Sequence, residues 1–545
     1  MSEQELQQCE QMLKNLLLPD NNIRKQGETQ LQACLSTQKN KETLCLYCSL
    51  LLNKSTDLNV LSYCAIIIRK LFLPSENNTS TLNKDMTPES KTKTKQNLLN
   101  ALQTQTNQSL RKKIADAAIC FFTELVGADE KWNEFLKYII SLFNLELNEA
   151  NALNIELGLH LLSNVYGTAY DELKEGVAIF LKNFTVYFKS NSLSLKAKTV
   201  QCINELLCSS LNKKETKQFK DYVFYILETT LRCIEGHDMD NLKVCLDSIQ
   251  DLSNCEPKLL RKNFNDIFIL MGKIIDNTEV DDNLREIAYE IIVNILENVP
   301  KVVEKDDEKV KIIVQSLFKY AMEIDNSVDD EWLNPKNINI IADEFIPEHK
   351  LDVATSLLTR LFEVLDEEKL FKLTSNNITE LINHSSDKEW KYKYIAYIVV
   401  AETAGQIKEL SEVEKLIIMI LNDINNPNIK VQYAALYCIA ELSEEHNPDF
   451  QNEYHAKIIP PLIQLFTQTK CLRVLLQITD SLDCFVEHMS EGDSAKYLQT
   501  SLDALFQIFI KPETECPPSL KEGILDVVKE FIDSSEQEFK KYYEF

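Results

Sequence analysis

Residues 281–296 read DDNLREIAYEIIVNIL, and this stretch decides the fold. A polar turn of Asp and Asn comes first, and Arg285 follows at the start of the next helical pattern. Leucine, isoleucine and alanine then recur every three or four residues, which is the spacing of one apolar face of an α-helix. Such a face needs an apolar neighbour to be stable, so the stretch predicts a helix packed within a larger helical assembly.

The same pattern, a polar turn followed by a helix with a basic first turn, recurs along the chain. Further copies lie at residues 19–31, 107–119, 190–203, 387–400 and 426–442. Steps of 43, 42, 47 and 42 residues separate equivalent positions at Arg111, Asn154, Lys196, Lys243 and Arg285, and steps of 39 and 43 separate Lys391, Lys430 and Arg473. A period of about 40 to 47 residues is typical of HEAT and armadillo repeats. We therefore expect an all-α protein, a single right-handed HEAT solenoid over residues 1–545 with about twelve helix pairs and with the second helices on its concave side.

The composition agrees with helices and excludes several functions. Among 545 residues there are only 10 glycines and 14 prolines, whereas sheet-rich folds need more of both at their turns. The net charge of −26 would repel nucleic acid and attract basic proteins. The chain shows no signal peptide, and no apolar run approaches the roughly 20 residues of a membrane span. We expect a monomer with no direct nucleic-acid partner and no membrane insertion.

The motifs of catalysis and of metal binding are missing from the sequence. Most of the 15 cysteines lie within apolar helical patterns, which suits a reducing compartment. Cys45 and Cys48 form one CxxC, but no second pair completes a zinc site, so two thiols on one helix turn are favoured over a metal or redox role. Neither a phosphate-binding glycine loop nor HExxH nor GxSxG occurs. We predict no enzyme, no catalytic residues, no cofactor and no metal site.

Two segments interrupt the regular array of repeats. Residues 74–96 are polar and of low complexity, and they predict an insertion between the second and third repeats. The step from Arg285 to Lys350 is 65 residues long, and its extra length holds an acidic loop at 323–331 within a repeat at 299–365. A run of charge is usually only solvated, but its place in a break of the array favours a functional loop.

Several short segments, spread from end to end, carry a resemblance to a known family. They are residues 17–26, 110–116, 329–332, 390–393, 433–435, 447–451 and 542–545. In these segments the chain resembles the importin-β (karyopherin-β) superfamily, and most closely its importin subunit beta-three type. Members of that type are about twice as long, so the resemblance covers their N-terminal half. We expect a truncated or naturally shortened form, since the family continues beyond Tyr543.

The resemblance implies a nuclear transport receptor that shuttles between cytoplasm and nucleus. Such a receptor binds basic localisation segments of cargo such as ribosomal proteins and histones, releases them on binding Ran-GTP, and contacts FG-repeat nucleoporins. The alternative is a static HEAT-repeat scaffold of the phosphatase type. Scaffold repeats of that kind are nearly uniform in length, and the 65-residue step argues against it.

The resemblance also implies two sets of site residues. Repeats at 1–127, together with the acidic loop, would contact Ran through Arg24, Lys25, Glu28, Arg111, Lys112, Asp116, Glu323, Asp325, Asp329, Asp330 and Glu331. Repeats at 370–545 would bind cargo through Trp390, Glu402, Tyr437, Glu441, Glu444, Asp480 and Asp483. Carboxylates on neighbouring repeats suit an extended peptide with spaced lysines. For the basic residues of the first set, an equal alternative is that they belong only to the solvated repeat signature.

Overall fold

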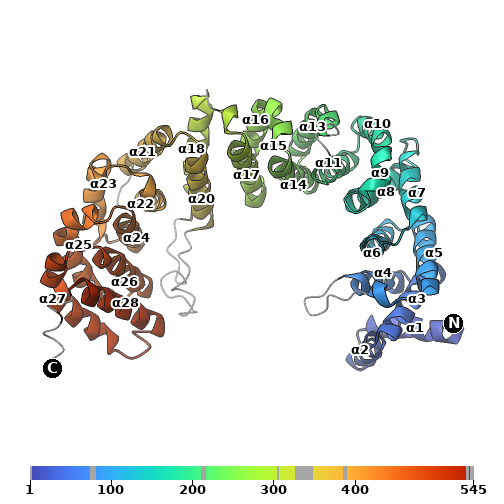
Figure 1. Cartoon of the computed structure of the whole chain (residues 1–545), viewed down its shortest axis with the longest axis horizontal. Helices are drawn as coiled ribbons and strands as arrows, with labels where there is room; N and C mark the ends of the chain where they lie inside the picture. Colours follow the sequence, from blue (N-terminus) through green and yellow to red (C-terminus); the bar gives the residue numbers. More distant parts are fainter. Residues whose placement is uncertain are drawn as a thin grey trace. The chain divides into compact units, whose positions relative to one another are not determined.

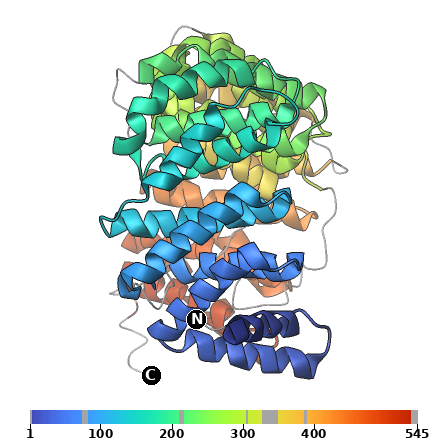
Figure 2. The same cartoon turned by 90° about the vertical axis from the view of Figure 1, so that its right-hand side faces the viewer.

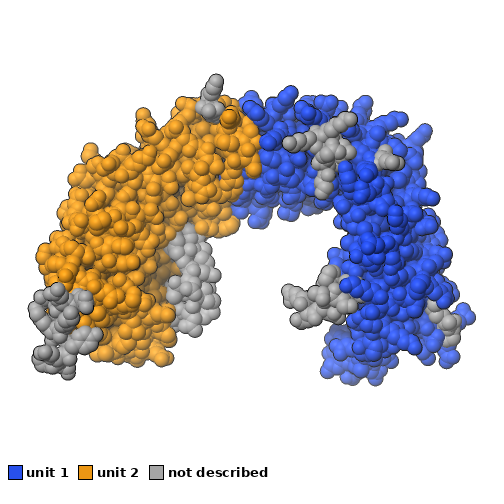
Figure 3. Space-filling model, in the orientation of Figure 1, with its two compact units in different colours: residues 1–294 blue, residues 295–545 orange. Residues whose placement is uncertain are grey.

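The structure, a computed structural model, describes residues 3–73, 82–209, 216–303, 306–325, 348–384, 389–535 and 539. All regular secondary structure among these residues is helical. The long helices follow one another as twelve pairs, in which a first helix is followed by a second helix that packs on it (Figure 1). The predicted all-α helical-repeat fold is therefore confirmed. The chain divides into two compact units, residues 1–294 and 295–545 (Figure 3).

The pairs that begin in unit 1 are α1 (Glu3–Leu16) with α2 (Asn21–Leu35), α3 (Gln38–Lys54) with α4 (Leu58–Phe72), α5 (Pro88–Thr104) with α6 (Gln108–Gly127), α7 (Asn133–Phe143) with α8 (Ala152–Val165), α10 (Val177–Tyr187) with α11 (Leu193–Cys208), α13 (Tyr222–Glu235) with α14 (Met239–Cys255), and α16 (Phe264–Ile275) with α17 (Asp282–Asn298). Short helices α9 (Tyr170–Leu173) and α15 (Pro257–Leu260) join some of them. The second helices α4, α6, α8, α11 and α14 pack on one another in chain order, so unit 1 is a stack of pairs (Figure 2).

The pairs of unit 2 are α18 (Asp307–Ala321) with α20 (His349–Val364), α21 (Glu367–His384) with α22 (Lys391–Glu402), α23 (Leu410–Asp423) with α24 (Ile429–Glu445), α25 (Asp449–Gln468) with α26 (Leu472–Glu487), and α27 (Glu491–Phe509) with α28 (Pro518–Ser534). Here α22, α24, α26 and α28 pack side by side as one layer, and α21, α23, α25 and α27 form the other (Figure 1).

The recurring polar turn and basic residue each have a structural task at the junction within a pair. The polar residue caps the second helix: side chains of Asp57, Asn107 and Asn428 accept hydrogen bonds from amides of the following first turn. The basic residue reaches back to the first helix, as Nε of Arg285 does when it donates to the carbonyl of Ile275 at 2.8 Å. Carbonyls at a helix end have no partner inside the helix, so this donor satisfies one of them.

The insertion expected at 74–96 is shorter than predicted. Helix α5 begins at Pro88, and the hydroxyl of Thr87 caps it by accepting from the amide of Ser90. Leu82 and Met86, just before it, are buried. The prediction was wrong over residues 82–96 because it followed apolar periodicity, whereas Thr-Pro-Glu is itself a helix-start signal. Residues 74–81 lie outside the described part of the chain.

The third pair ends with α6 at Gly127, and the eighth pair, α18 with α20, falls within the repeat expected at 299–365. The long link between α18 and α20 contains the predicted acidic loop, most of which lies outside the described residues.

Candidate functional site

Carboxylates from successive second helices of unit 2 lie on one surface. We call this the acidic strip, and its members are Glu402 of α22, Glu441 and Glu444 of α24, Asp480 and Asp483 of α26, and Asp526 and Glu530 of α28. The hydroxyl of Tyr437 donates to Oε1 of Glu402 at 3.0 Å, which ties α24 to α22. The thiol of Cys484 likewise donates to Oε1 of Glu444 at 3.2 Å. The packing of the second helices thus brings six of the seven predicted cargo residues together.

The carboxylates of the acidic strip repel one another. Burial and the neighbouring carboxylates, Glu444 and Glu402 foremost, raise the pKa of Glu441 to about 7. Burial also raises the pKa of Glu402, although the hydrogen bond from Tyr437 opposes the shift. Carboxylates gathered on one surface create a negative potential there. That potential favours cationic side chains over anionic ones.

The acidic strip extends one repeat further than the sequence predicted. Burial and the carboxylates of Glu530 and Asp526 raise the pKa of Asp483 to about 6, and Oδ1 of Asp483 is buried without a hydrogen bond. Repeat spacing identifies Asp526, because Glu441, Asp483 and Asp526 follow at steps of 42 and 43, and Glu530 lies one helical turn further along α28. A cation also lies beside this end of the strip. The side chain of Lys529 on α28 is largely exposed, and its Nζ is 2.5 Å from Oε1 of Glu530.

Trp390, the seventh predicted cargo residue, does not join the strip. It directly precedes α22, whereas Glu402 is the last residue of that helix, about 18 Å away along its axis. The ammonium group of Lys430 lies 5.3 Å from the centre of its ring. Lys430 is itself buried and paired with Glu348, so Trp390 belongs to a packed contact between repeats.

The raised pKa of Glu441 predicts a pH-dependent stability. Because the folded-state pKa lies above the usual 4.5, the folded protein gains stability when Glu441 is protonated and loses it as the pH rises from about 4.5 through about 7. The loss should be about 1 to 2 kcal/mol once partial exposure is allowed for. Glu441→Gln should remove it, raising the urea midpoint of unit 2 at pH 8 but not at pH 4.

The matched control for this measurement is Glu414→Gln. Glu414 is exposed on the first helix α23 of the same repeat. A pH-dependent change in the urea midpoint that is seen with Glu441→Gln and not with Glu414→Gln would assign the effect to the buried carboxylate. Identical pH profiles for the two variants would contradict the prediction.

The residues predicted to contact Ran differ in whether their side chains are exposed or bonded within the fold. Arg24, Lys25 and Glu28 are exposed on α2, where Arg24 donates to Asn21 and lies 3.7 Å from Glu28. Arg111 is engaged within the fold instead. Its guanidinium donates to the carbonyl of Leu102 at 2.7 Å and to two further acceptors, the side-chain oxygens of Asn154 at 2.6 Å and Tyr138 at 2.9 Å. It therefore joins three neighbouring helices.

Asp116 also has a partner within the fold, His160, whereas the side chain of Lys112 is exposed. Nε2 of His160 lies 2.8 Å from Oδ1 of Asp116. Burial opposes ionisation of Asp116, but this contact and nearby cations outweigh it and hold its pKa below the usual range. Lys112 lies one residue beyond Arg111, with its side chain exposed.

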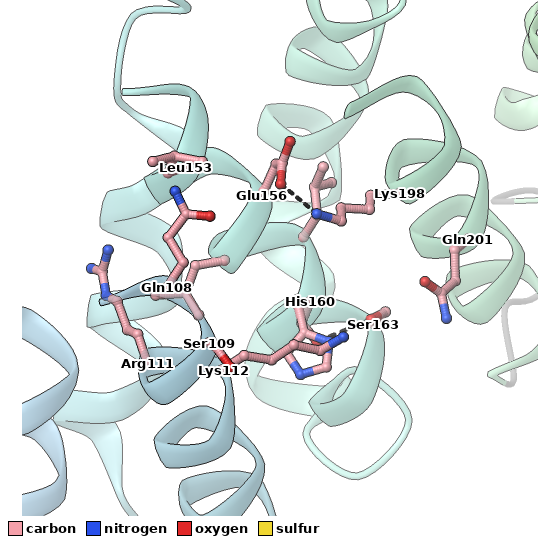
Figure 4. A pocket seen from close by; sticks show the side chains of 12 residues that line it. Gln108, Ser109, Arg111, Lys112, Leu153, Glu156, His160, Ser163, Lys198 and Gln201 are labelled. Atoms are coloured by element: carbon pink, nitrogen blue, oxygen red, sulfur yellow. Dashed lines mark hydrogen bonds and ion pairs between the residues drawn. The ribbon is translucent and has the colours of Figure 1, made fainter. Parts of the chain in front are cut away.

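Lys112 borders a cavity of about 370 Å³ in unit 1 (Figure 4). Helices α6, α8 and α11 line it, with Gln108 and Lys112 on the first, Leu153 on the second and Gln201 on the third. The ion pair between Lys198 and Glu156 closes one side (Figure 4). The cavity combines an apolar wall with a cation, which suits a protein segment carrying an acidic and an aliphatic side chain.

The acidic loop is described only at its start. Nζ of Lys350 lies 3.0 Å from Oε2 of Glu323, so this carboxylate joins the two helices of the eighth pair. Asp325 is exposed. The other three members, Asp329, Asp330 and Glu331, lie outside the described residues, as does Trp332.

Two further observations bear on function. Within the described ranges, no three His, Cys, Asp or Glu side chains are grouped so as to hold a metal ion. No described helix combines the length and the apolar character needed to cross a membrane.

Comparison with known proteins gives a consistent set of similarities. Residues 106–270 match a family described as IPO5-like, TPR repeats. Importin subunit beta-3 of Saccharomyces cerevisiae is 23% identical over 545 residues, covering 98% of this chain and 48% of the yeast protein. A crystal structure of a Kap121p mutant superposes with a TM-score of 0.75 at 22% identity, and Kap121p bound to Nup53p with 0.73 at 21%. Both cover 100% of this chain and 50% of Kap121p.

Stacked helix pairs with a strip of carboxylates on their second helices define a helical-repeat protein. The matched family segment and the yeast relative make the chain similar to importin subunit beta-3, and the Kap121p structures share its fold. The chain spans about half the length of the relatives it matches.

Proposed function

We propose that this protein is a nuclear transport receptor that binds basic segments of cargo proteins along the acidic strip. The observation that carries the proposal is the row of carboxylates on four adjacent second helices, in which Glu441 and Asp483 have raised pKa values. Packed helices lie about 8 to 10 Å apart, and three residues of extended chain span a similar length. A peptide with a lysine at every third position could therefore pair with successive helices.

The relatives support a role in transport rather than in catalysis. One is an importin by name, and structures of Kap121p exist with Nup53p, the SUMO protease Ulp1p and Pho4p bound. We infer cargo such as ribosomal proteins and histones, contact with FG-repeat nucleoporins, and shuttling between cytoplasm and nucleus for this chain.

Cargo release would follow from linked binding. Ran-GTP on the first three repeats and a basic peptide on the acidic strip would each lower the affinity for the other by the same factor, since coupling between two sites is reciprocal. Calorimetric titration of a lysine-containing peptide tests this with the chain alone and with saturating Ran loaded with GTP or GDP. We expect peptide affinity to fall with Ran-GTP and not with Ran-GDP. Equal affinity in all three titrations would reject the receptor function.

Lys112 is the residue of α6 best placed to contact Ran, because Arg111 and Asp116 are engaged within the fold. Lys112→Glu should weaken Ran-GTP binding by about five- to tenfold, the size expected for reversal of one interfacial charge. Lys113→Glu is the matched control, since Lys113 carries the same charge one residue away and does not line the cavity. Equal losses for the two variants would assign the effect to overall charge alone.

A further inference from the structure

Two cysteines on neighbouring second helices of unit 1 form a disulfide. Cys208 is the last residue of α11, and Cys255 is the last residue of α14, 47 positions further along the chain. Their Cα atoms lie 5.8 Å apart. Helices α11 and α14 pack against each other, so the bond joins the ends of two adjacent repeats.

These two cysteines differ from the others in exposure. Cys208 and Cys255 are both exposed to solvent. The other thirteen are free thiols, and none of them is exposed. Buried thiols behave as small apolar side chains and are poorly accessible to oxidants, whereas exposed ones exchange with small thiols. The two fully exposed cysteines are thus neighbours in the fold, while the remaining thiols are buried or half-buried.

We propose that Cys208 and Cys255 are a reversible redox modification site that fastens α11 to α14 when oxidised. The oxidant class is a small-molecule disulfide such as glutathione disulfide. One cysteine thiolate attacks it, forming a mixed disulfide and releasing one glutathione thiolate. The second cysteine then attacks the protein-bound sulfur, forming the intramolecular bond and releasing the second glutathione. The two cysteine protons end on the two glutathione thiols, so atoms and electrons balance.

The surroundings of the pair favour slow exchange over rapid sensing. Both thiols sit at the C-terminal end of a helix, where the helix dipole disfavours a negative charge. Nδ2 of Asn204, one turn before Cys208, donates to Oδ2 of Asp251, one turn before Cys255, at 2.9 Å. The carboxylate of Asp251 therefore lies near the pair and disfavours the thiolate further. Once formed, the bond should persist until a reductant is present in excess.

The bond would act on the motion between repeats. In a solenoid each repeat contacts mainly its neighbours, so bending is a sum of small rotations at the junctions between repeats. A disulfide allows its Cα atoms only a narrow range of separation, which fixes one side of the α11–α14 junction. Oxidation would stiffen unit 1 at this junction and leave the other junctions unchanged. The inference does not depend on the proposed transport function.

The experiment uses the full chain equilibrated with excess glutathione disulfide or with excess reduced glutathione. Free thiols are then blocked with N-ethylmaleimide, and peptides are identified by mass spectrometry. We expect the peptides of Cys208 and Cys255 to be joined after oxidation and both alkylated after reduction. Amide hydrogen exchange in the last turns of α11 and α14 should be about tenfold or more slower in the oxidised protein. Full alkylation of both cysteines after oxidation, or equal exchange in the two states, would overturn the proposal.

Variants make the assignment specific. Cys208→Ser and Cys255→Ser should each abolish the difference in exchange between the two buffers. Cys471→Ser is the matched control, because Cys471 is a half-exposed cysteine of unit 2 that lies outside the disulfide. It should leave the difference intact. A difference that survives in both pair variants would place the redox effect elsewhere.

Discussion

Replacement of both Glu402 and Glu441 by lysine is expected to abolish binding of a basic localisation peptide. The two carboxylates lie on adjacent helices α22 and α24, where a single peptide can contact both. Each partly desolvated, charge-assisted hydrogen bond contributes roughly 1.5 to 3 kcal/mol, so loss of two should lower the affinity by a factor of about 10² to 10⁴. Repulsion by the new ammonium groups adds to this loss. Isothermal titration of the double variant measures the effect.

The matched control reverses the same number of charges elsewhere in unit 2. Glu412 and Glu414 are exposed on the first helix α23 of the repeat that contains Glu441. Lysine at these two positions should change peptide affinity only slightly, because scattered exposed charges contribute about 0 to 1 kcal/mol. Ran-GTP binding should be retained in both double variants. Unchanged peptide affinity in the Glu402 and Glu441 variant would show that cargo binds elsewhere.

Arg111→Leu is expected to destabilise unit 1 rather than merely weaken a partner. The guanidinium satisfies the carbonyl of Leu102 and joins α6 to Asn154 and Tyr138 of the next repeat. Removal of these three bonds should lower the local free energy of unfolding by about 3 kcal/mol, since a charged donor is lost and the Leu102 carbonyl keeps only the longer bond from the Tyr138 hydroxyl, at 3.3 Å. Hydrogen exchange of amides in α5 to α8 measures this local stability.

Lys112→Leu is the control, because Lys112 is exposed on the same helix turn. Its replacement should leave exchange in α5 to α8 within about 0.5 kcal/mol of the unaltered protein. If both variants gave the same exchange rates, Arg111 would not be holding the junction. Arg111 would then be as good a candidate for contacting a partner protein as for a structural role.

The fold was predictable from sequence because its signals are local. The Asp and Asn that cap second helices, the apolar residues every third or fourth position and the repeat period of about 40 residues each act within one pair of helices. The same period indicates which carboxylates share a surface, and one further step of 43 residues reaches Asp526. Glu530 follows one helical turn later on α28. The insertion predicted at 74–96 is too long, because Thr87 and Pro88 form a helix-start signal that apolar periodicity does not register.

What the sequence determined by itself was the class of fold, the order of the helix pairs and the face on which acidic side chains gather. Only the tertiary structure decided which charged and aromatic side chains are held in contacts within the fold. Arg111 is held by Asn154, 43 residues away, and Trp390 is covered by Lys430, which lies in the next repeat. The Cys208–Cys255 bond also joins two adjacent repeats. Periodicity tells which side of a helix a residue occupies, but the atom it meets lies one repeat away, and that pairing is set by how the helices pack.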